Sequence, residues 1–419
     1  MHTNTIVCAG RTALAAGVLT ACSGSASVSQ PIGRTAQAAD LAPDSTEAIS
    51  TQAPAIDWAS IGQIAPRPID LGERSASDPL PSADIVILTW TSAEWSAMDH
   101  VFVNSGAPRS PSDDSWRSAW SSYTHNASSF SGGDSGGELW GSFQMVQIID
   151  ANGAPWRVIL FKSNAHLAHE PWIAGLRAMV ENILADAAPR LIYSIGTAGA
   201  AQRDQQLGDA VVTNAAFLQA TLPHNASDPA NGQTFTSAFY PTLDLEAEAE
   251  KLMFPLGDAA TAKDLDGLVE SVLGSSSVSA GDLIDGALTN LTAPTVHPLP
   301  GVPLNTSDDF GMAPGNGVDP YSVYEEDDAV VAEAAGLANV GYAFIRNVSD
   351  TVVPDTTTSG GAISLSVRQS WSSALYDRYG FLTAVNGAIA AWGTIAGNTQ
   401  TLIAPAPAPA DAGAPATGG

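Results

Sequence analysis

Five short segments of this 419-residue chain bring together carboxylates, hydroxyls and glycines that could support acid–base chemistry. They are Leu88–Glu94, Ser194–Gly199, Ser279–Ile284, Tyr324–Ala329 and Arg346–Asp350. Each begins, ends or borders an apolar stretch of strand-like composition. Ligand sites in α/β sheets gather at the carboxyl ends of strands, where carboxylates can act as general acid and general base. The sequence therefore predicts one site assembled from several strand ends.

Each segment also has a simpler interpretation when it is taken alone. Glu94 could be an acid in the first turn of a helix, and the run Glu326–Asp328 could cap a helix start. Ser349-Asp350 could likewise form an N-cap. The glycine segment could be an ordinary turn. Only the combination of the segments and their order favours a functional site.

Together and in this order, the segments resemble the nucleoside phosphorylase/nucleosidase superfamily, which has the purine nucleoside phosphorylase-like fold. Its members carry a strand-end acid, a G-x-A-G … G-D-x-V-V segment, an S-G-D strand end, an M-E-x-E-type segment and a terminal R-x-x-S-D. The resemblance extends to the methylthioadenosine/S-adenosylhomocysteine nucleosidases, and the acidic segment is similar to that of the purine nucleoside permease-like branch. It spans about residues 84–395, with insertions at about 105–137 and 285–320.

The resemblance implies roles for the acidic and hydroxyl residues in cleaving an N-ribosidic bond. Asp350 would protonate the departing purine at N7, a role that needs a carboxyl with a raised pKa. Ser349 would orient the base or Asp350. Glu326 would accept hydrogen bonds from the ribose hydroxyls, although a gapless count selects Asp327 instead, and both remain candidates.

The resemblance also assigns the sugar and base contacts. Thr197 and the backbone N–H groups of Ala198 and Gly199 would hold the nucleophile or the sugar. Ile284 takes the place after Gly281-Asp282 where the family often has an aromatic residue that stacks on the base. This replacement, and the acid in place of the family's methionine before Asp327, leave the preferred base and 5′ substituent open.

Glu94 separates hydrolysis from phosphorolysis. It falls where the family's nucleosidases keep the carboxylate that polarises water. A phosphorylase usually binds phosphate with arginines, and neither 89–93 nor 163–167 contains one. We therefore expect a hydrolase that cleaves purine-type nucleosides. A phosphorylase and a non-catalytic nucleoside-binding lipoprotein are the alternatives. The family commonly forms dimers or larger assemblies, so the resemblance implies a homo-oligomer.

The elements that must position these residues alternate between strands and helices. This alternation predicts a single large α/β domain at 82–403, with a mixed twisted sheet flanked by helices. The predicted strands are at 85–88, 143–149, 156–161, 190–195, 211–212, 278 and 342–348. The hairpin signal Asn152-Gly153 joins the second and third of these. Helices are predicted from 171 to 188, from 330 to 337 and from 367 to 396.

The two ends of the chain have a different composition. Residues 1–22 resemble a lipoprotein signal, because an apolar stretch precedes Leu19-Thr20-Ala21-Cys22. Cys22 would carry lipid and anchor an exported bacterial protein in the cell envelope without spanning the membrane. Residues 23–81 are predicted to be a flexible tether, and the Pro/Ala-rich tail 404–419 to be disordered.

Charge and motif counts exclude several classes. With 16 basic and 43 acidic residues the net charge is −27, which disfavours nucleic-acid binding. No metal or cofactor is expected, because the dinucleotide and P-loop patterns are missing and His166-x-x-His169-Glu170 matches no zinc motif. Ser135 in G-D-S-G-G has too little folded chain before it for a trypsin-like triad.

Overall fold

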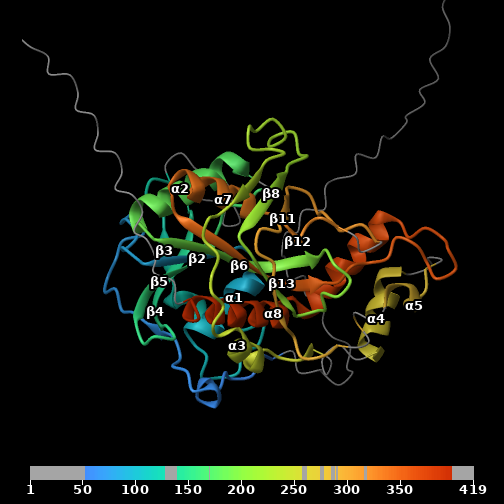
Figure 1. Ribbon diagram of the computed structural model, residues 1–419, viewed down its shortest axis with the longest axis horizontal. Coiled ribbons are helices and arrows are strands. Elements are labelled where there is room, and N and C mark those ends of the chain that lie inside the picture. The colour runs from blue at the N-terminus through green and yellow to red at the C-terminus, as the bar shows by residue number, and fades with distance from the viewer. Residues whose placement is uncertain are drawn as a thin grey trace, which may run out of the picture. The chain divides into compact units, whose positions relative to one another are not determined.

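The computed structural model describes residues 52–127, 139–168, 170–256, 262–273, 278–284, 288, 291–315 and 319–398. These residues belong to one compact unit (Figure 1). The predicted lipid-bearing Cys22, the G-D-S-G-G segment and the tail 404–419 lie outside them. No helix in the described part of the chain is both long and apolar enough to cross a membrane.

Thirteen strands of the described residues form one mixed sheet. They are β1 (Arg67–Pro68), β2 (Ile85–Thr89), β3 (Ser121–Tyr123), β4 (Gly141–Ile149), β5 (Pro155–Ser163), β6 (Leu191–Ala200), β7 (Ala210–Thr213), β8 (Ala215–Gln219), β9 (Thr234–Thr236), β10 (Val296–Pro298), β11 (Leu304–Ser307), β12 (Val323–Glu325) and β13 (Gly341–Asp350). Neighbours follow the order β1-β4-β5-β2-β6-β12-β11-β8-β9, and β13 pairs with β6 and β7. Strands β5, β2, β6 and β13 are parallel, whereas β4 and β7 run against them. The predicted mixed α/β fold is confirmed.

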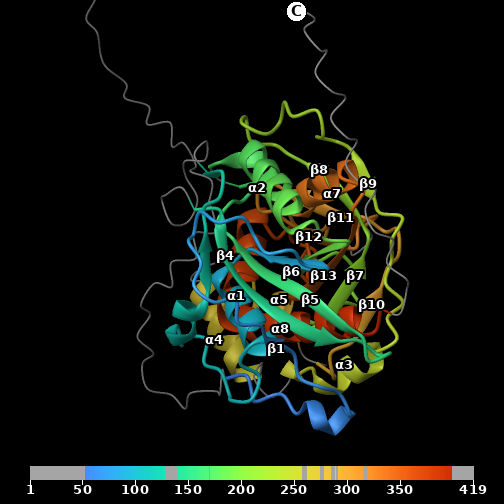
Figure 2. The ribbon, with the colours of Figure 1, turned by 90° about the vertical axis from the view of Figure 1, so that its left-hand side faces the viewer.

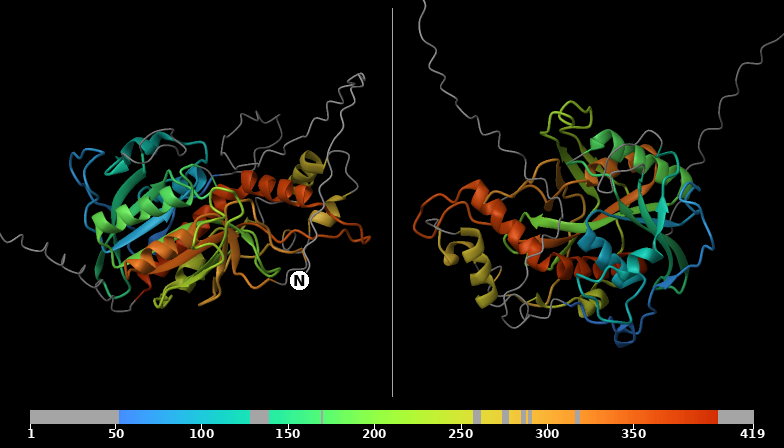
Figure 3. Two further views of the ribbon diagram at one scale, coloured as in Figure 1. Left: turned by 90° about the horizontal axis from the view of Figure 1, so that it is seen from above. Right: turned by 180° about the vertical axis from the view of Figure 1, so that it is seen from behind.

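Helices cover both faces of this sheet (Figures 2 and 3). The helical elements are η1 (Trp58–Ile61), α1 (Ser92–Phe102), η2 (Ser115–Ala119), α2 (Trp172–Ala187), α3 (Glu246–Leu252), α4 (Ala262–Leu273), α5 (Ala280–Leu283), α7 (Asp328–Leu337) and α8 (Leu365–Ala396). Helices α2 and α7 pack together on one face, and α1, α3 and α8 bury their apolar side chains on the other. The central strands are therefore covered on both sides, which explains their continuous apolar runs.

The long C-terminal helix α8 organises the second face. Its residues from Tyr379 to Ala396 are almost all buried, against α1, β13 and β6. A helix that is apolar around most of its circumference belongs inside a protein rather than on its surface. Because α8 contacts the strands that carry the candidate site residues, its register affects the site directly.

The predicted tether extends too far into the folded region. Trp58 is buried against Trp392 of α8, with ring centroids 4.7 Å apart. Strand β1 pairs with β4, and the backbone N–H of Leu80 donates to Asp186 on α2. The prediction is therefore wrong for residues 52–81. Isolated apolar residues in a Ser/Pro-rich segment give no periodicity, but they can still pack on a core that the rest of the chain supplies.

Three further predictions about the elements are wrong. No strand forms at 278 in the described residues, where Ala280–Leu283 is the short helix α5. The segment 285–320 is more than an insertion, because it contributes β10 and β11, and β11 lies between β8 and β12. The glycine segment after 195 is not a turn but the extended end of β6.

Candidate active site

Glu94 lies at the start of α1, immediately after β2. Thr91 is the N-cap, and its hydroxyl and the Glu94 side chain form a capping box. One carboxylate oxygen, Oε2, accepts hydrogen bonds from the backbone N–H groups of Trp90 and Thr91, both at 2.9 Å, and from Thr89 Oγ1 at 3.2 Å. The carboxylate is thus held by the turn that joins β2 to α1.

The other oxygen of Glu94 reaches the next strand. Oε1 accepts hydrogen bonds from both the backbone N–H and Oγ1 of Thr197 on β6, each at 2.8 Å. Glu94 is only 3% exposed and accepts five hydrogen bonds in total. A carboxylate offers about four lone-pair sites. The structure therefore brings Glu94 and Thr197 into direct contact, and protein donors already occupy the carboxylate.

Asp350 ends β13, on the neighbouring side of β6. Ser349 Oγ lies 2.9 Å from Asp350 Oδ1 and 3.3 Å from the carbonyl oxygen of Ala198. Asp350 pairs with Gly199 across the ladder, and a Cβ atom on Gly199 would lie 3.0 Å from Asp350 Oδ2. Because Gly199 has no side chain, the carboxyl group of Asp350 can lie close to the backbone of β6. The predicted contacts among Ser349, Asp350 and the glycine segment are present.

A small pocket opens beside Asp350. Its lining comes from three segments: Gly199, Ala200, Met312, Ala313, Asp350, Thr351, Val352 and Val353. Apart from Asp350 and Thr351, the side chains are apolar or absent. The pocket is small, about 10 Å³, and it places one carboxyl group among apolar walls, where a carboxyl group can act as a general acid. The sequence reasoning missed Met312, Val352 and Val353, because their composition is that of any loop.

The two carboxylates converge on one strand. Glu94 holds Thr197, and Asp350 faces Gly199 two positions further along β6. Two residues of extended strand span about 7 Å. Chain segments more than 250 residues apart in sequence thus place two acids at one strand end, as the motif order predicted.

Arg346 is the centre of a buried charge cluster under this strand end. Its guanidinium donates to Asp328 through both Nε, at 2.7 Å, and Nη2. Nη2 also donates to Glu325 Oε2 at 3.0 Å and to Ser194 Oγ at 3.1 Å. A Cβ atom on Gly196 would lie within 2.8 Å of both Arg346 Nη1 and Glu94 Oε1. The guanidinium of Arg346 and the carboxylate of Glu94 therefore both lie against β6 at Gly196.

Burial raises the pKa of Glu325 well above its ordinary value, and burial also raises the pKa of Asp328, while Arg346 opposes both shifts. The same two carboxylates raise the pKa of Arg346 further despite its burial. The guanidinium is therefore a fixed cation whose charge is balanced inside the protein. In the sequence Arg346 is recognisable only as part of the R-x-x-S-D motif, and its ion pairs with Glu325 and Asp328 were not predicted.

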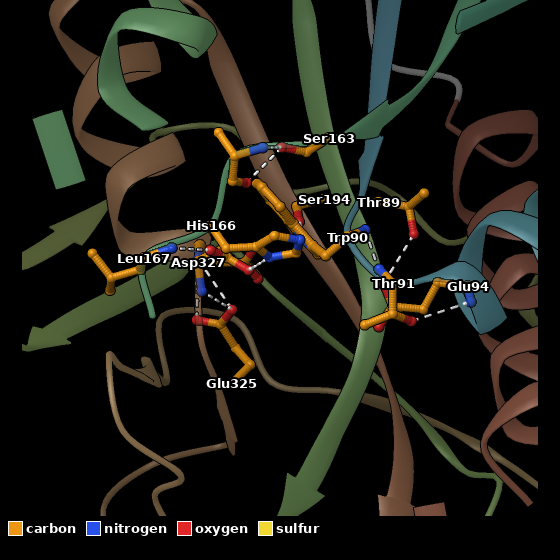
Figure 4. A network of polar contacts seen from close by, with 12 residues as sticks. Thr89, Trp90, Thr91, Glu94, Ser163, His166, Leu167, Ser194, Glu325 and Asp327 are labelled. Carbon is orange, nitrogen blue, oxygen red and sulfur yellow. Dashed lines mark hydrogen bonds and ion pairs between the residues drawn. The ribbon is translucent and has the colours of Figure 1, made fainter. Parts of the chain in front are cut away.

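The two ribose candidates differ in burial, and Figure 4 shows the surroundings of Asp327. Asp327 is buried and accepts a hydrogen bond from the Leu167 backbone N–H at 2.8 Å, and His166 Nδ1 lies 3.3 Å from its other oxygen. Glu326 is partly exposed. Asp327 thus helps to fasten β12 to the end of β5. His166, which the zinc-motif test set aside, is one of its partners.

Trp90 connects this corner to Glu94. Its indole N–H donates to Ser194 Oγ at 3.0 Å, and its ring lies 5.9 Å from the His166 ring. Figure 4 shows Trp90 lying between His166 on one side and Glu94 on the other. The same residue donates its backbone N–H to Glu94. The acidic corner and the Glu94 corner therefore share one network of contacts.

Ile284 lies away from this arrangement. It packs against the core beside the short helix α5, and Asp282 accepts hydrogen bonds from Ser279 and from the backbone N–H of Thr358. It is not at a strand end. Ile284 does not line the pocket beside Asp350, and its assignment to the base stays a prediction.

A better match to the same pattern lies in the segment that was treated as an insertion. Ser307 ends β11, next to β12, and is followed by Asp308, Asp309 and Phe310. This is a serine and an acid at a strand end with an aromatic residue after them. Asp308 accepts hydrogen bonds from the 221–225 turn. Residues 304–310 have the sequence L-N-T-S-D-D-F. The sequence S-A-G-D at 279–282 contains the family's Gly-Asp pair and was therefore preferred.

Metal binding was not expected. In the described residues, no group of three or more histidine, cysteine, aspartate or glutamate side chains has the geometry to hold a metal ion.

Comparisons with known proteins find distant similarity to solved structures alone. No family model and no curated protein matches the chain. Among solved structures, a 5′-methylthioadenosine/S-adenosylhomocysteine nucleosidase from Neisseria meningitidis in complex with methylthio-immucillin-A is similar at 13% identity and a TM-score of 0.39, covering 74% of this chain and 97% of that one.

A futalosine hydrolase of Helicobacter pylori has 11% identity and a TM-score of 0.34, with 72% and 96% covered. A nucleosidase of the first kind from Colwellia psychrerythraea, in complex with adenine, has 14% identity and a TM-score of 0.34, with 74% and 98% covered. TM-scores this low do not establish a shared fold. Functional inference therefore depends on the residues of this chain.

Proposed function

We propose that this protein is a nucleosidase that hydrolyses the N-ribosidic bond of purine-type nucleosides. The observation that carries the proposal is the convergence of Glu94 and Asp350 on Thr197 and Gly199 of the same strand, next to an apolar pocket. Acid and base on opposite sides of a reacting bond are what hydrolysis of a glycosidic bond requires. The resemblance to nucleosidases in the order of the motifs supports the same assignment.

The mechanism follows from the positions of the two acids. The base lies beside Asp350, at the mouth of the pocket, and Asp350 gives its proton to the base nitrogen that gains electrons as the bond from C1′ to the base breaks. Water adds to C1′ and loses a proton to Glu94. Ser349, through its contact with Asp350 Oδ1, keeps the acidic carboxyl oriented toward the pocket. Both protons and the bonding electron pair are then accounted for.

Glu94 must exchange one of its five donors for the attacking water. Three of the donors are backbone N–H groups, two in the β2–α1 turn and one on β6, but the other two are the hydroxyls of Thr89 and Thr197. A hydroxyl rotates at little cost, so either one can release an oxygen of Glu94. Thr197 faces the sugar side of the strand end in this proposal, and its hydroxyl can then bind the same water.

Hydrolysis is favoured over phosphorolysis by the state of Arg346. A phosphorylase needs a cation that is available to hold phosphate. The buried arginine that faces Gly196 together with Glu94 is already bound by Asp328 and Glu325. Phosphate would have to displace one of these carboxylates from a buried pair, which is costly.

One observation favours a second candidate, a binding protein that does not catalyse. Glu94 accepts hydrogen bonds on both oxygens from five donors, which is the pattern of a structural carboxylate. A binder would keep the pocket and Asp350 as a hydrogen-bonding group. Export through the signal at 1–22 and lipidation of Cys22 belong to both candidates, and radiolabelled palmitate incorporation that Cys22→Ser abolishes would test them.

The deciding experiment follows release of free base by chromatography from a panel of purine and pyrimidine nucleosides, with and without phosphate. Release without phosphate that Asp350→Asn abolishes supports the hydrolase. Release only with phosphate identifies a phosphorylase. Binding of a purine nucleoside by calorimetry with no release in either buffer identifies the binding protein.

A further inference from the structure

The first turns of α8 hold the two segments that form the apolar walls of the pocket. Arg368 donates from Nε to the carbonyl oxygen of Val353 at 3.1 Å and from Nη2 to that of Ala313 at 2.6 Å. Val353 follows Asp350 by three residues, and both carbonyl-bearing residues line the pocket. One side chain therefore fastens the two walls to the same helix.

The contacts of Arg368 define what it contributes. In the part of the chain that the structure describes, its side-chain hydrogen bonds go to these two carbonyls, and it forms no ion pair. Burial lowers the pKa of its guanidinium, which the more distant Asp355 only partly offsets. A planar fork of donors can bind two acceptors at once, whereas a lysine ammonium is a point charge on a flexible stem. Arg368 thus acts through donor geometry.

The same helix also contacts the Glu94 corner. The phenolic hydroxyl of Tyr376 donates to Thr91 Oγ1 at 3.1 Å. Thr91 is the N-cap of α1, and the same oxygen accepts the backbone N–H of Glu94 at 3.4 Å. Tyr376 is thus one contact removed from the carboxylate.

We propose that Arg368 and Tyr376 are positioning residues, and that α8 serves as the spacer that sets the separation of Asp350 and Glu94. The two side chains lie eight residues apart on one continuous helix, a rise of about 12 Å. Arg368 holds the segments beside Asp350, and Tyr376 holds the N-cap residue beside Glu94. The kinetic part of this inference rests on the proposed nucleosidase function, whereas the structural part does not.

Matched variants on the same helix test the proposal in the full chain. Arg368→Lys and Tyr376→Phe are the test variants. Arg378→Lys and Tyr379→Phe are the controls, because the side chains of Arg378 and Tyr379 bind the carboxylate of Asp264 on α4 and contact neither corner of the site. The control pair reports what loss of an arginine fork or a phenol does to the helix in general.

The two test variants should change different kinetic constants. Arg368→Lys loosens the walls that hold the base, so KM should rise about tenfold with kcat within about threefold of the original. Tyr376→Phe loosens the cap of Glu94, so kcat should fall about threefold to tenfold with KM unchanged. The controls should leave both constants within about twofold. Equal effects in test and control variants would overturn the proposal.

Hydrogen exchange decides the structural part without reference to activity. Arg368→Lys should speed exchange in peptides covering 311–313 and 351–353 together, and Tyr376→Phe should do so in peptides covering 91–95. Exchange that is unchanged in these peptides contradicts the spacer role. If the original protein releases no base, the proposed function has failed, and the exchange result alone then confirms or overturns the positioning roles.

Discussion

The Asp350 corner and the Glu94 corner are built in opposite ways. Glu94 is held by five donors from β2, the β2–α1 turn and β6, and its helix cap is held in turn by α8. Asp350 accepts from its neighbour Ser349 and lines a pocket with apolar walls. One carboxylate joins elements of the fold, whereas the other faces the space where a ligand fits.

The difference shows how a sheet can carry an acid and a base at one strand end. The hydrogen bonds that fix Glu94 also tie together β2, β6 and the start of α1, whereas, among the described residues, few contacts of the fold depend on the carboxyl group of Asp350. Variants that leave size unchanged but remove charge should therefore affect the two corners differently. At the Asp350 corner the loss should be one of rate, and at the Glu94 corner it should include stability.

The largest effect is expected from Asp350→Asn. An amide cannot donate a proton to the leaving base, so the rate of base release should fall about 10²-fold to 10⁴-fold. The side chain keeps an oxygen for Ser349, so the free energy of unfolding should change by less than about 1 kcal/mol. Chromatographic rates and urea unfolding measure the two quantities. A large stability loss would show that the two corners do not differ as described.

Arg346→Gln should produce the largest loss of stability. It leaves the carboxylates of Glu325 and Asp328 buried without their cation, which costs about 3–5 kcal/mol. Arg177→Gln is the matched control, because Arg177 also joins two acids, Asp228 and Glu333, but is partly exposed. Its loss should be about 1 kcal/mol. Equal losses in urea unfolding would contradict a dominant role for burial.

Glu94→Gln should lower both rate and stability. Every partner of Glu94 is a donor, so the amide nitrogen of glutamine meets N–H or O–H groups wherever it points. Unpaired buried donors cost about 1–3 kcal/mol. Thr91→Ala, which removes only the cap, should cost about 1 kcal/mol. Urea unfolding of both variants beside Asp350→Asn tests the contrast, and an unchanged Glu94→Gln protein would remove it.

Local signals predicted most of the elements that carry these corners. The apolar run at Ile85–Leu88, the Asn152-Gly153 hairpin and the helical spacing after Val367 each depend on neighbouring residues alone, and each is present as β2, the β4–β5 turn and α8. The motif order predicted one site that includes Glu94, Thr197, Gly199 and Asp350, but the contacts of Glu94 with Thr197 and of Asp350 with Gly199 became visible only in the structure. These pairings follow from which strands are neighbours in a parallel sheet.

What could not be predicted depends on contacts between distant segments. Trp58 has no periodic neighbours, and its burial depends on Trp392 more than 300 residues later. Likewise, β11 is short and polar, so only its pairing with β8 and β12 identifies it as a strand. The pocket walls around Met312 gain their place from Arg368, which no local pattern connects with them.

The smallest effect concerns the support behind Asp350. The backbone carbonyl of Asp209 accepts the N–H of Val348, two residues before Asp350, and the Asp209 carboxylate lies 2.8 Å from His297 Nε2. This hydrogen bond raises the pKa of His297, with burial opposing it and the charges of Asp209, Asp204 and Glu250 adding to it.

Because the folded-state pKa of His297 lies above its unfolded value of about 6.5, the protonated pair stabilises the fold fully below that pH. The contribution is lost as the pH rises through the raised pKa. Urea unfolding from about pH 5 to about pH 9 should show this decline in the original protein and a shallower one in His297→Gln. Identical profiles would mean that the pair contributes nothing to the Asp350 corner. A decline that accompanies falling base release would connect the protonation of His297 to the positioning of the acid.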